Sequence, residues 1–161
     1  MTDPITQLIL HEARLLDKGL LDDWLALYAK DACYWIPMSD GADPLQDSSI
    51  IYDDHSRLTL RVEQLMRQNR IAQNPASETL RMISNISIDK MDDNAAKATY
   101  SLLAIETRSG DWRQRGLGEL RFFPAHSEIE CINSAAGWLI QKKVVRLLNR
   151  KQPIEGLSFI I

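Results

Sequence analysis

The fold is decided where the sequence reads Thr79-Leu80-Arg81-Met82-Ile83-Ser84-Asn85-Ile86-Ser87-Ile88-Asp89. Apolar residues alternate here with polar ones, and a period of two indicates a β-strand that ends at the turn 92–94. The alternating apolar residues are Leu80, Met82, Ile86 and Ile88. Turn residues and apolar patterns predict further strands over 98–107, 112–123 and 137–149, with a last short strand over 157–161. The second half of the chain therefore predicts an antiparallel meander.

Helices are predicted before this meander. Asp3 is placed to cap a helix with Pro4 at its first position, and apolar residues recur on one face until Gly19. A second short helix follows from Leu21, with Tyr28 on its apolar side. Residues 33–36 then form a first strand that ends at Pro37.

A long loop over 38–49 leads to a third helix. Asp53 and Asp54 suit the positive end of this helix, whose apolar residues follow helical spacing. These residues are Leu58, Val62, Leu65 and Met66. Helices followed by a meander predict an α+β protein with one domain over residues 1–161. A strongly curved antiparallel sheet around N-terminal helices is the cone-shaped, cystatin-like fold of nuclear transport factor 2, ketosteroid isomerases and scytalone dehydratase.

Composition excludes several classes of function. The 161 residues are 45% hydrophobic and 25% charged, as in a soluble globular protein. A net charge of −3 disfavours binding to nucleic acid. Apolar runs are only a few residues long and the chain opens with Met1-Thr2-Asp3-Pro4, so we expect no membrane span and no secretory signal. We interpret Cys33 and Cys131 as reduced core thiols of a cytoplasmic protein.

The sequence offers no pattern for a redox metal. A Rieske centre needs two Cys and two His in paired short spacings, and a mononuclear iron needs two His and a carboxylate. Cys33 and Cys131 lie far apart, and neither has a His two or three residues away. The histidines His11, His55 and His126 are scattered over a helix, a helix N-terminus and a strand end. We therefore expect no metal-binding and no cofactor-binding residue in this chain.

Acid/base catalysis inside the cone is the main alternative. The side-chain types that such catalysis uses are supplied by Tyr28, Asp31, Tyr34, Asp53, His55 and Tyr100. A structural interpretation accounts for most of them, with the acids at a helix N-terminus, His55 solvated beside them and the tyrosines packed within strands. We expect no catalytic residue, and if catalysis occurs we expect Asp53 and His55 to perform it. Cys33 is interpreted as a buried apolar residue, and the glycines at 116–118 as a bulge or bend.

Charged residues on the strands suggest a solvated face or a polar subunit interface. One stripe comprises Arg113, Arg115, Glu119 and Arg121, and a second comprises Lys142, Lys143, Arg146, Arg150 and Lys151, with Trp112 and Trp138 nearby. The apolar segment 157–161 is expected to be buried against the sheet or against a neighbouring chain. We predict self-association through the long strands and this segment.

Several stretches together resemble one family. They are Leu21-Asp22-Asp23-Trp24-Leu25-Ala26-Leu27-Tyr28, Tyr34-Trp35-Ile36-Pro37, Tyr52-Asp53-Asp54 to Arg61-Val62, Ser84-Asn85-Ile86, and Gly137-Trp138 leading to a Leu-Ser-Phe-Ile-Ile end. In order and spacing they are similar to the small (β) subunits of aromatic-ring-hydroxylating dioxygenases. The resemblance implies a non-catalytic β subunit that forms a trimer carrying three α subunits.

The resemblance also implies where the cofactors are. The α subunits of this family hold a Rieske 2Fe-2S cluster and a mononuclear iron, and a reductase, sometimes through a ferredoxin, supplies electrons from NADH or NADPH. The function expected for this chain is thus structural, within the catabolism of aromatic compounds. Two alternatives remain open, a stand-alone isomerase, dehydratase or cyclase of the same fold and a ligand-binding cone without chemistry.

Overall fold

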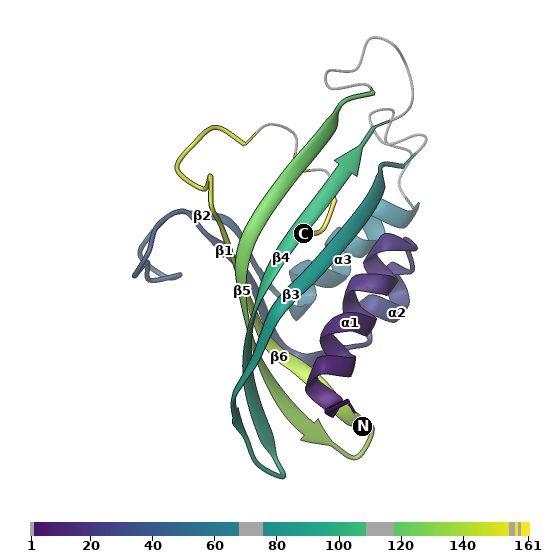
Figure 1. Ribbon diagram of the computed structural model, residues 1–161, viewed down its shortest axis with the longest axis vertical. Coiled ribbons are helices and arrows are strands. Elements are labelled where there is room, and N and C mark those ends of the chain that lie inside the picture. The colour runs from purple at the N-terminus through teal and green to yellow at the C-terminus, as the bar shows by residue number, and fades with distance from the viewer. Residues whose placement is uncertain (1, 68–75, 109–117, 155–156, 158) are drawn as a thin grey trace.

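The computed structural model describes residues 2–67, 76–108, 118–154, 157 and 159–161 (Figure 1). The helices are α1 (Pro4–Asp17), α2 (Leu21–Leu25) and α3 (His55–Arg67). The strands are β1 (Tyr28–Pro37), β2 (Ser49–Asp54), β3 (Glu78–Met91), β4 (Ala95–Thr107), β5 (Leu120–Ser134) and β6 (Gly137–Leu147). No helix among the described residues is both long and apolar enough to cross a membrane.

The strands form a six-stranded sheet in the order β2-β1-β6-β5-β4-β3. All neighbours are antiparallel except β1 and β6, which run parallel. The sheet is strongly curved, and the three helices lie together on its concave side (Figure 1). Inward-facing residues of β4, from Ala96 to Glu106, are buried at every second position, and they share a core with α1 and α3. The predicted α+β class and the cone shape are confirmed.

The N-terminal helix has the predicted ends. The backbone N–H of Thr6 donates to Asp3 Oδ1 at 2.8 Å, so Asp3 caps α1, and Pro4 occupies the first turn. Gly19 follows with a φ of +67°. The second helix is shorter than predicted, because it ends at Leu25 and Tyr28 already begins β1. The Tyr28 side chain is nevertheless buried in the core, as predicted.

The region before α3 corrects the prediction. Residues 49–54 form the strand β2, which pairs with β1 so that Tyr52 lies opposite Trp35, and the helix begins only at His55. Of the two acids, Asp54 caps α3, because its Oδ1 accepts from the Arg57 N–H at 2.8 Å. Asp53 belongs to the strand. On α3 itself, Leu58 and Val62 are buried as predicted, whereas Met66 is 45% exposed.

A bulge in β3 changes which apolar residues face inward. Four residues of β3, from Ser84 to Ser87, oppose three of β4, from Thr99 to Ser101, and Asn85 within the bulge has a φ of +52°. One extra residue reverses the face of every side chain beyond it. Ile86 and Ile88 therefore pack against the core, while Leu80 and Met82 are 56% and 57% exposed. The alternation predicted a strand correctly, but these four residues do not share a face.

Several predicted features fall outside the described residues. They include Trp112, Arg113 and Arg115 and most of the glycine-containing stretch 116–118; β5 is described from Leu120 onward. The described residues of segment 157–161 do not form a strand, yet Ile160 and Ile161 are 2% and 0% exposed. Ile160 and Ile161 are therefore buried in their own chain, which is the first of the two expectations for this segment, whereas Leu157 and Phe159 are partly exposed. The part of this segment in self-association stays a prediction.

Candidate functional site

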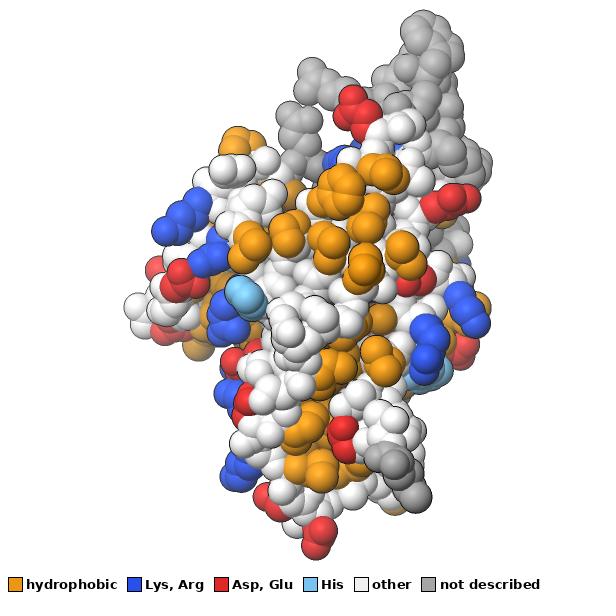
Figure 2. Space-filling view, in the orientation of Figure 1, with side chains coloured by type: hydrophobic (Ala, Val, Ile, Leu, Met, Phe, Trp, Pro, Cys, Tyr) orange, Lys and Arg blue, Asp and Glu red, His pale blue; other side chains and the backbone are white. Residues whose placement is uncertain are grey.

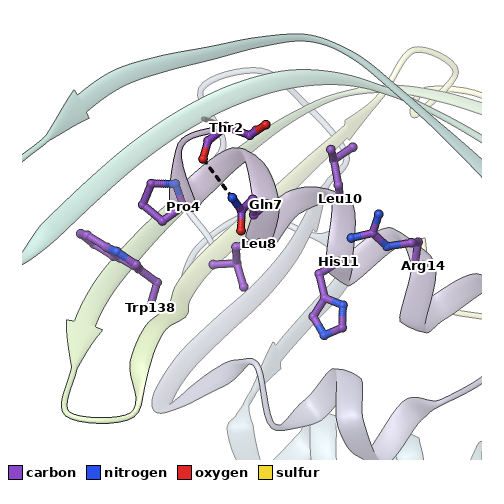
Figure 3. Close-up of a pocket in the computed structure, with 8 residues that line it drawn as sticks. All are labelled: Thr2, Pro4, Gln7, Leu8, Leu10, His11, Arg14 and Trp138. Carbon is purple, nitrogen blue, oxygen red and sulfur yellow. Dashed lines mark hydrogen bonds between the residues drawn. The ribbon is translucent and has the colours of Figure 1, made fainter.

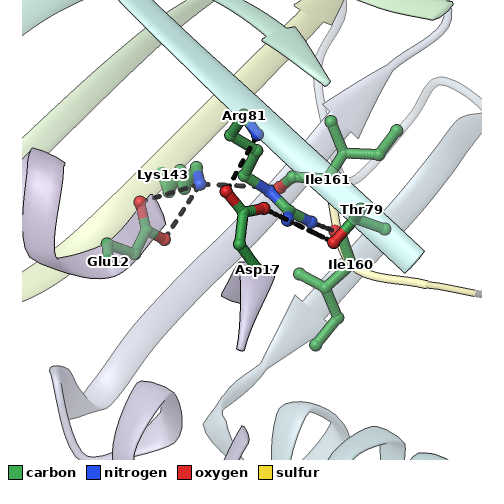
Figure 4. A network of polar contacts seen from close by, with 7 residues as sticks. All are labelled: Glu12, Asp17, Thr79, Arg81, Lys143, Ile160 and Ile161. Atoms are coloured by element: carbon green, nitrogen blue, oxygen red, sulfur yellow. Dashed lines mark hydrogen bonds and ion pairs between the residues drawn. The ribbon is translucent and has the colours of Figure 1, made fainter. Parts of the chain in front are cut away.

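A buried carboxylate lies at the centre of the cone. Glu12 of α1 is 2% exposed, and both of its oxygens lie 2.9 Å from Lys143 Nζ of β6 (Figure 4). Glu12 Oε1 also accepts from Trp24 Nε1 at 3.1 Å and from the Tyr28 hydroxyl at 2.7 Å. Every donor around this carboxylate is thus engaged, as a buried ion pair requires.

Burial and charge shift the pKa values of the groups around Glu12. Burial lowers the pKa of Lys143, against the opposing attraction of Glu12. Burial also raises the pKa of Tyr28 well above its usual value, and the negative charge of Glu12 adds to that effect. The pKa values of Tyr34 and Tyr100 are raised for the same two reasons. All three tyrosines are therefore neutral hydroxyls over the ordinary range of pH.

A second ion pair lies beside the first. Arg81 of β3 places Nη1 2.5 Å from Asp17 Oδ1 and 3.0 Å from the Thr79 hydroxyl, and its Nη2 donates to the carbonyl oxygen of Ile160 (Figure 4). The backbone N–H of Arg81 donates to Asp17 Oδ2 at 2.9 Å. The Tyr34 hydroxyl donates to the carbonyl oxygen of Ile161 at 2.7 Å. Lys143 Nζ lies 3.5 Å from the same Ile161 oxygen, so side chains from β1, β3 and β6 meet residues 160–161 inside the cone.

The structure brings together only some of the candidate catalytic residues. Tyr28, Tyr34 and Tyr100 are buried in the cone. Asp31 lies on β1 and accepts from Gln141 Nε2 at 2.8 Å in an exposed position. Asp53 is buried, and its Oδ2 lies 2.6 Å from Arg61 Nε. His55 lies in the first turn of α3. Among the contacts of the described residues, Asp53 pairs with Arg61 and not with His55.

The charged residues of the interior were not predicted from the sequence. Glu12 lies on the buried face of α1 between Ile9 and Ala13, and this carboxylate at an apolar position was a usable signal. Lys143 was placed in one charged stripe with Lys142, but neighbouring residues of a strand face opposite sides of the sheet. Within β6, Lys142 and Arg146 therefore face outward with Glu128, and Lys143 faces inward. Arg121 pairs with Glu106 at 2.8 Å.

The positions of Cys and His do not fit a redox metal. In the described part of the chain, no group of three or more His, Cys, Asp or Glu residues could hold a metal ion. Cys33 and Cys131 are free thiols on β1 and β5, and burial raises the pKa of the Cys131 thiol to about 12. Cys33 is only partly buried, because it lies on β1 at a position that is not enclosed by the core, so the prediction of a buried residue is wrong for Cys33 and right for Cys131. Partial burial still raises the pKa of the Cys33 thiol, which disfavours its thiolate. The three histidines lie on α1, α3 and β5.

A surface hollow lies where α1 meets β6. It has a volume of about 660 Å³ and is lined mainly by α1 residues, among them His11 and Arg14, with Trp138 of β6 on the other side (Figure 3). The only hydrogen bond drawn there joins Gln7 Nε2 to the Thr2 carbonyl oxygen at 2.9 Å. Trp138 packs partly against the core, so the predicted role of this residue at an interface is not needed to explain its position.

The convex side of the sheet carries an apolar patch, which we call the outer apolar face. Cross-strand rows form it, with Leu80, Ile105 and Phe122 in one row, Met82, Leu103 and Pro124 in the next, and Leu120 at the end. Leu120 and Phe122 are 61% and 54% exposed. Figure 2 shows hydrophobic side chains gathered over β3, β4 and β5 on this side. Contiguous exposed apolar residues of this kind mark interaction surfaces.

Comparison with known proteins identifies relatives. Residues 11–152 match the model of a family described as ring hydroxylating beta subunit. The chain is 41% identical over 87 residues to the small oxygenase component of the p-cumate 2,3-dioxygenase system of Pseudomonas putida, covering 52% of this chain and 48% of that protein. The matched part thus spans about half the length of that relative.

Solved structures share the fold. The beta subunit of benzoate 1,2-dioxygenase from Burkholderia mallei superposes with a TM-score of 0.76 at 23% identity, over 99% of both chains. An NTF2-like protein with a cystatin-like fold from Novosphingobium aromaticivorans gives a TM-score of 0.59 at 14% identity, over 90% of this chain and 80% of the other. At these identities the similarity shows the fold alone.

Proposed function

Because the chain belongs to the family of ring-hydroxylating beta subunits, we propose that it is the non-catalytic β subunit of an aromatic-ring-hydroxylating dioxygenase. In this role it is a single-domain cytoplasmic protein that takes part in the breakdown of an aromatic compound. The family match over residues 11–152 carries this proposal. The names of the relatives, which act on p-cumate and benzoate, support an aromatic substrate for the complex.

The contrast between the two sides of the sheet supports a structural role. Inside the cone, the ionisable groups pair with one another, and Ile160 and Ile161 occupy the space beside them. A general base must reach a proton on the substrate, and Glu12 is enclosed by Trp24, Tyr28 and Lys143. The same arrangement counts against the alternatives of a stand-alone isomerase, dehydratase or cyclase.

The proposed partners supply the chemistry. Three β chains form a trimer that carries three α subunits, and the α subunits hold the Rieske 2Fe-2S cluster and the mononuclear iron. Electrons come from NADH or NADPH through a reductase, directly or by way of a ferredoxin. We assign the outer apolar face to contacts between β chains, because its seven residues carry no charge and permanent contacts between like chains are depleted in charge.

Reconstitution tests the proposal. The purified chain should bind no stoichiometric iron and show no oxygenase activity, whereas co-expression with a large subunit that has paired Cys-x-His and Cys-x-x-His ligands should yield an iron-containing, active complex of both chains. Metal analysis and turnover with each preparation are the measurements. Tightly bound iron at one per isolated chain, or oxidation without a partner, would overturn the proposal.

Oligomeric state is a separate test. Light scattering of the isolated chain should give the mass of a trimer. A monodisperse monomer at micromolar concentration would count against the proposed trimer while leaving the family assignment intact.

A further inference from the structure

A cavity lies where helices α1 and α3 end and strand β3 begins. Its volume is about 240 Å³, and its wall is formed mainly by α1, α3, the start of β3, and Phe159 and Ile160. Since a water molecule takes up about 30 Å³ of the liquid, this volume equals that of about eight waters. The cavity is therefore too small for a drug-sized compound and suits a compact molecule with a single ring.

Most of the wall of this cavity is apolar. Leu16 of α1 is 5% exposed, and Leu65 of α3 packs partly against the core. The ring of Phe159 lies edge-on to the ring of Phe123, with centroids 5.2 Å apart, so Phe159 is held against β5. Met66 lines the cavity and is 45% exposed, so the cavity reaches the surface beside this residue. A ligand that buries hydrocarbon against these side chains gains hydrophobic stabilisation.

The polar part of the wall lies on β3. Thr79 lines the cavity, and its hydroxyl oxygen accepts from Arg81 Nη1 at 3.0 Å (Figure 4). The hydroxyl group of Thr79 also lies 3.4 Å from Asp17 Oδ1. This distance is longer than the range of about 2.5–3.0 Å that is usual for O–H···O hydrogen bonds, so the Thr79 proton is held weakly. Thr79 is therefore able to donate this proton to an oxygen in the cavity while it still accepts from Arg81.

The charges beside Thr79 favour a neutral ligand. Arg81 Nη1 lies 2.5 Å from Asp17 Oδ1, and the Arg81 side chain is 3% exposed, so a carboxylate of the chain already balances this cation. An anionic ligand that reached the Thr79 hydroxyl would also come close to the Asp17 carboxylate, and like charges repel each other. A carbonyl oxygen without charge accepts the same proton and avoids most of this repulsion.

We propose that this cavity binds a compact, neutral and largely apolar ketone. The carbonyl oxygen of the ketone accepts from the Thr79 hydroxyl, and its hydrocarbon part packs against Leu65, Met66 and Phe159. An aromatic ring is favoured there, because aromatic rings pair edge-to-face with one another and make attractive contacts with the sulfur of methionine. The inference is independent of the proposed subunit function, since all residues of this cavity belong to a single chain.

Titration of the full-length chain with acetophenone tests the site. In methyl-labelled protein, the NMR signals of Met66 and Ile160 should shift with a Kd of about 1 mM or lower, as expected for so small a ligand. The signals of Met91 and Ile132, at the other end of the sheet, should not shift. Benzoate, which has a similar size and a negative charge, should bind more weakly. Unchanged Met66 and Ile160 signals at about ten times that concentration, or tighter binding of benzoate, would refute the proposal.

A variant of Thr79 tests the role of its hydroxyl group. Thr79→Val keeps the branched shape of the side chain and should weaken the binding of acetophenone roughly three- to tenfold, the effect of one hydrogen bond. The binding of ethylbenzene, which has no oxygen, should stay the same in this variant. Equal affinity of acetophenone for the variant and the original chain would overturn the proposal.

A second variant covers the case in which Thr79→Val does not fold. Ala76 is exposed and lines the cavity, so Ala76→Trp fills part of this space and should weaken the binding of acetophenone by roughly tenfold or more. The matched control Ala136→Trp, in the exposed turn between β5 and β6, should leave binding unchanged. Equal binding by these two variants would also overturn the proposal. None of these measurements involves a large subunit, so a failure here leaves the subunit proposal standing.

Discussion

The two sides of the curved sheet differ in which kind of side chain they bury and which they expose. On the concave side, charged residues are buried, and Lys143 and Glu106 are 2% and 0% exposed. On the convex side, apolar residues are exposed, with Met82 at 57% and Phe122 at 54%. In a chain that makes no contacts with other chains, we would expect apolar residues to be buried and charged residues to be exposed. Burying charge is costly, and exposing apolar area forgoes hydrophobic stabilisation.

The concave side of the sheet stabilises the fold of the chain, whereas the convex side is available for contacts with other chains. The interior charges are paired with each other and with backbone oxygens, so they stabilise the arrangement of α1 on the sheet. The outer apolar face has no comparable covering among the described residues, and it gains stabilisation when another surface covers it. Changes on the inner side should therefore alter folding, and changes on the outer side should alter association.

The largest expected effect follows from breaking the inner ion pair. Lys143→Met leaves the Glu12 carboxylate buried without its cation, and we expect a loss of about 3–5 kcal/mol in the free energy of unfolding. Chemical denaturation measures this loss. The control Lys142→Met removes the neighbouring cation from the outward side and should change stability by less than about 0.5 kcal/mol. Equal effects in the two variants would remove the distinction between the two sides.

An outer-face variant should give the opposite pattern. Phe122→Asp places a charge in the middle of the outer apolar face, and we expect association to weaken by about 2 kcal/mol or more, roughly 30-fold in the dissociation constant. Sedimentation across a concentration series measures this. Leu45→Asp is the matched control, since Leu45 is 83% exposed in the loop before β2, away from this face. Association unchanged by Phe122→Asp would show that another surface joins the chains.

High pH should lower the stability of the folded chain through the three tyrosines buried in the cone. The pKa values of Tyr28, Tyr34 and Tyr100 are raised in the folded chain, so the unfolded chain loses their protons first, near pH 10. Their contribution to stability is complete below that pH and falls above it, by about 1.4 kcal/mol per pH unit for each tyrosine. Lys143, with its lowered pKa, contributes a slope of the opposite sign.

Tyr100→Phe isolates one of these contributions. The slope of unfolding free energy against pH above 10 should become less steep by about 1.4 kcal/mol per pH unit, because the variant leaves Lys143 unchanged. Denaturation at a series of pH values from 8 to 11 measures both slopes. Parallel slopes for the variant and the original chain would mean that Tyr100 titrates normally in the folded state.

The smallest effects are expected for three adjacent residues at the start of α3, namely Asp53, Asp54 and His55. Asp54→Ala removes the helix cap and should cost about 1 kcal/mol. Asp53→Asn or His55→Ala should leave turnover of a reconstituted complex nearly intact, since Asp53 pairs with Arg61 and not with His55. Calorimetric unfolding and turnover measure the two outcomes. A loss of turnover of roughly 10² or more in a stable, assembled Asp53→Asn complex would instead support acid/base catalysis.

The sequence alone determined the elements whose signal is local. Asp3 and Pro4 predicted the start of α1, and the alternation after residue 79 predicted β3, because capping and strand period depend on neighbouring residues. The strand β2 was missed, since Ile50, Ile51 and Tyr52 are too short a run to be recognised without their pairing to β1. The family was recognised from several short motifs in a consistent order, none of them specific by itself.

Only the tertiary structure decided which side each residue faces. The bulge at Asn85 turns Leu80 and Met82 outward and Ile86 inward, and nothing in the alternation reveals it. The partners Glu12 and Lys143 are 131 positions apart, and Ile161 meets Tyr34 across 127 positions. Local patterns specify strands and helices because their interactions span a few residues. Buried pairs and the two sides of the sheet depend on contacts between distant residues, which the curvature of the folded sheet creates.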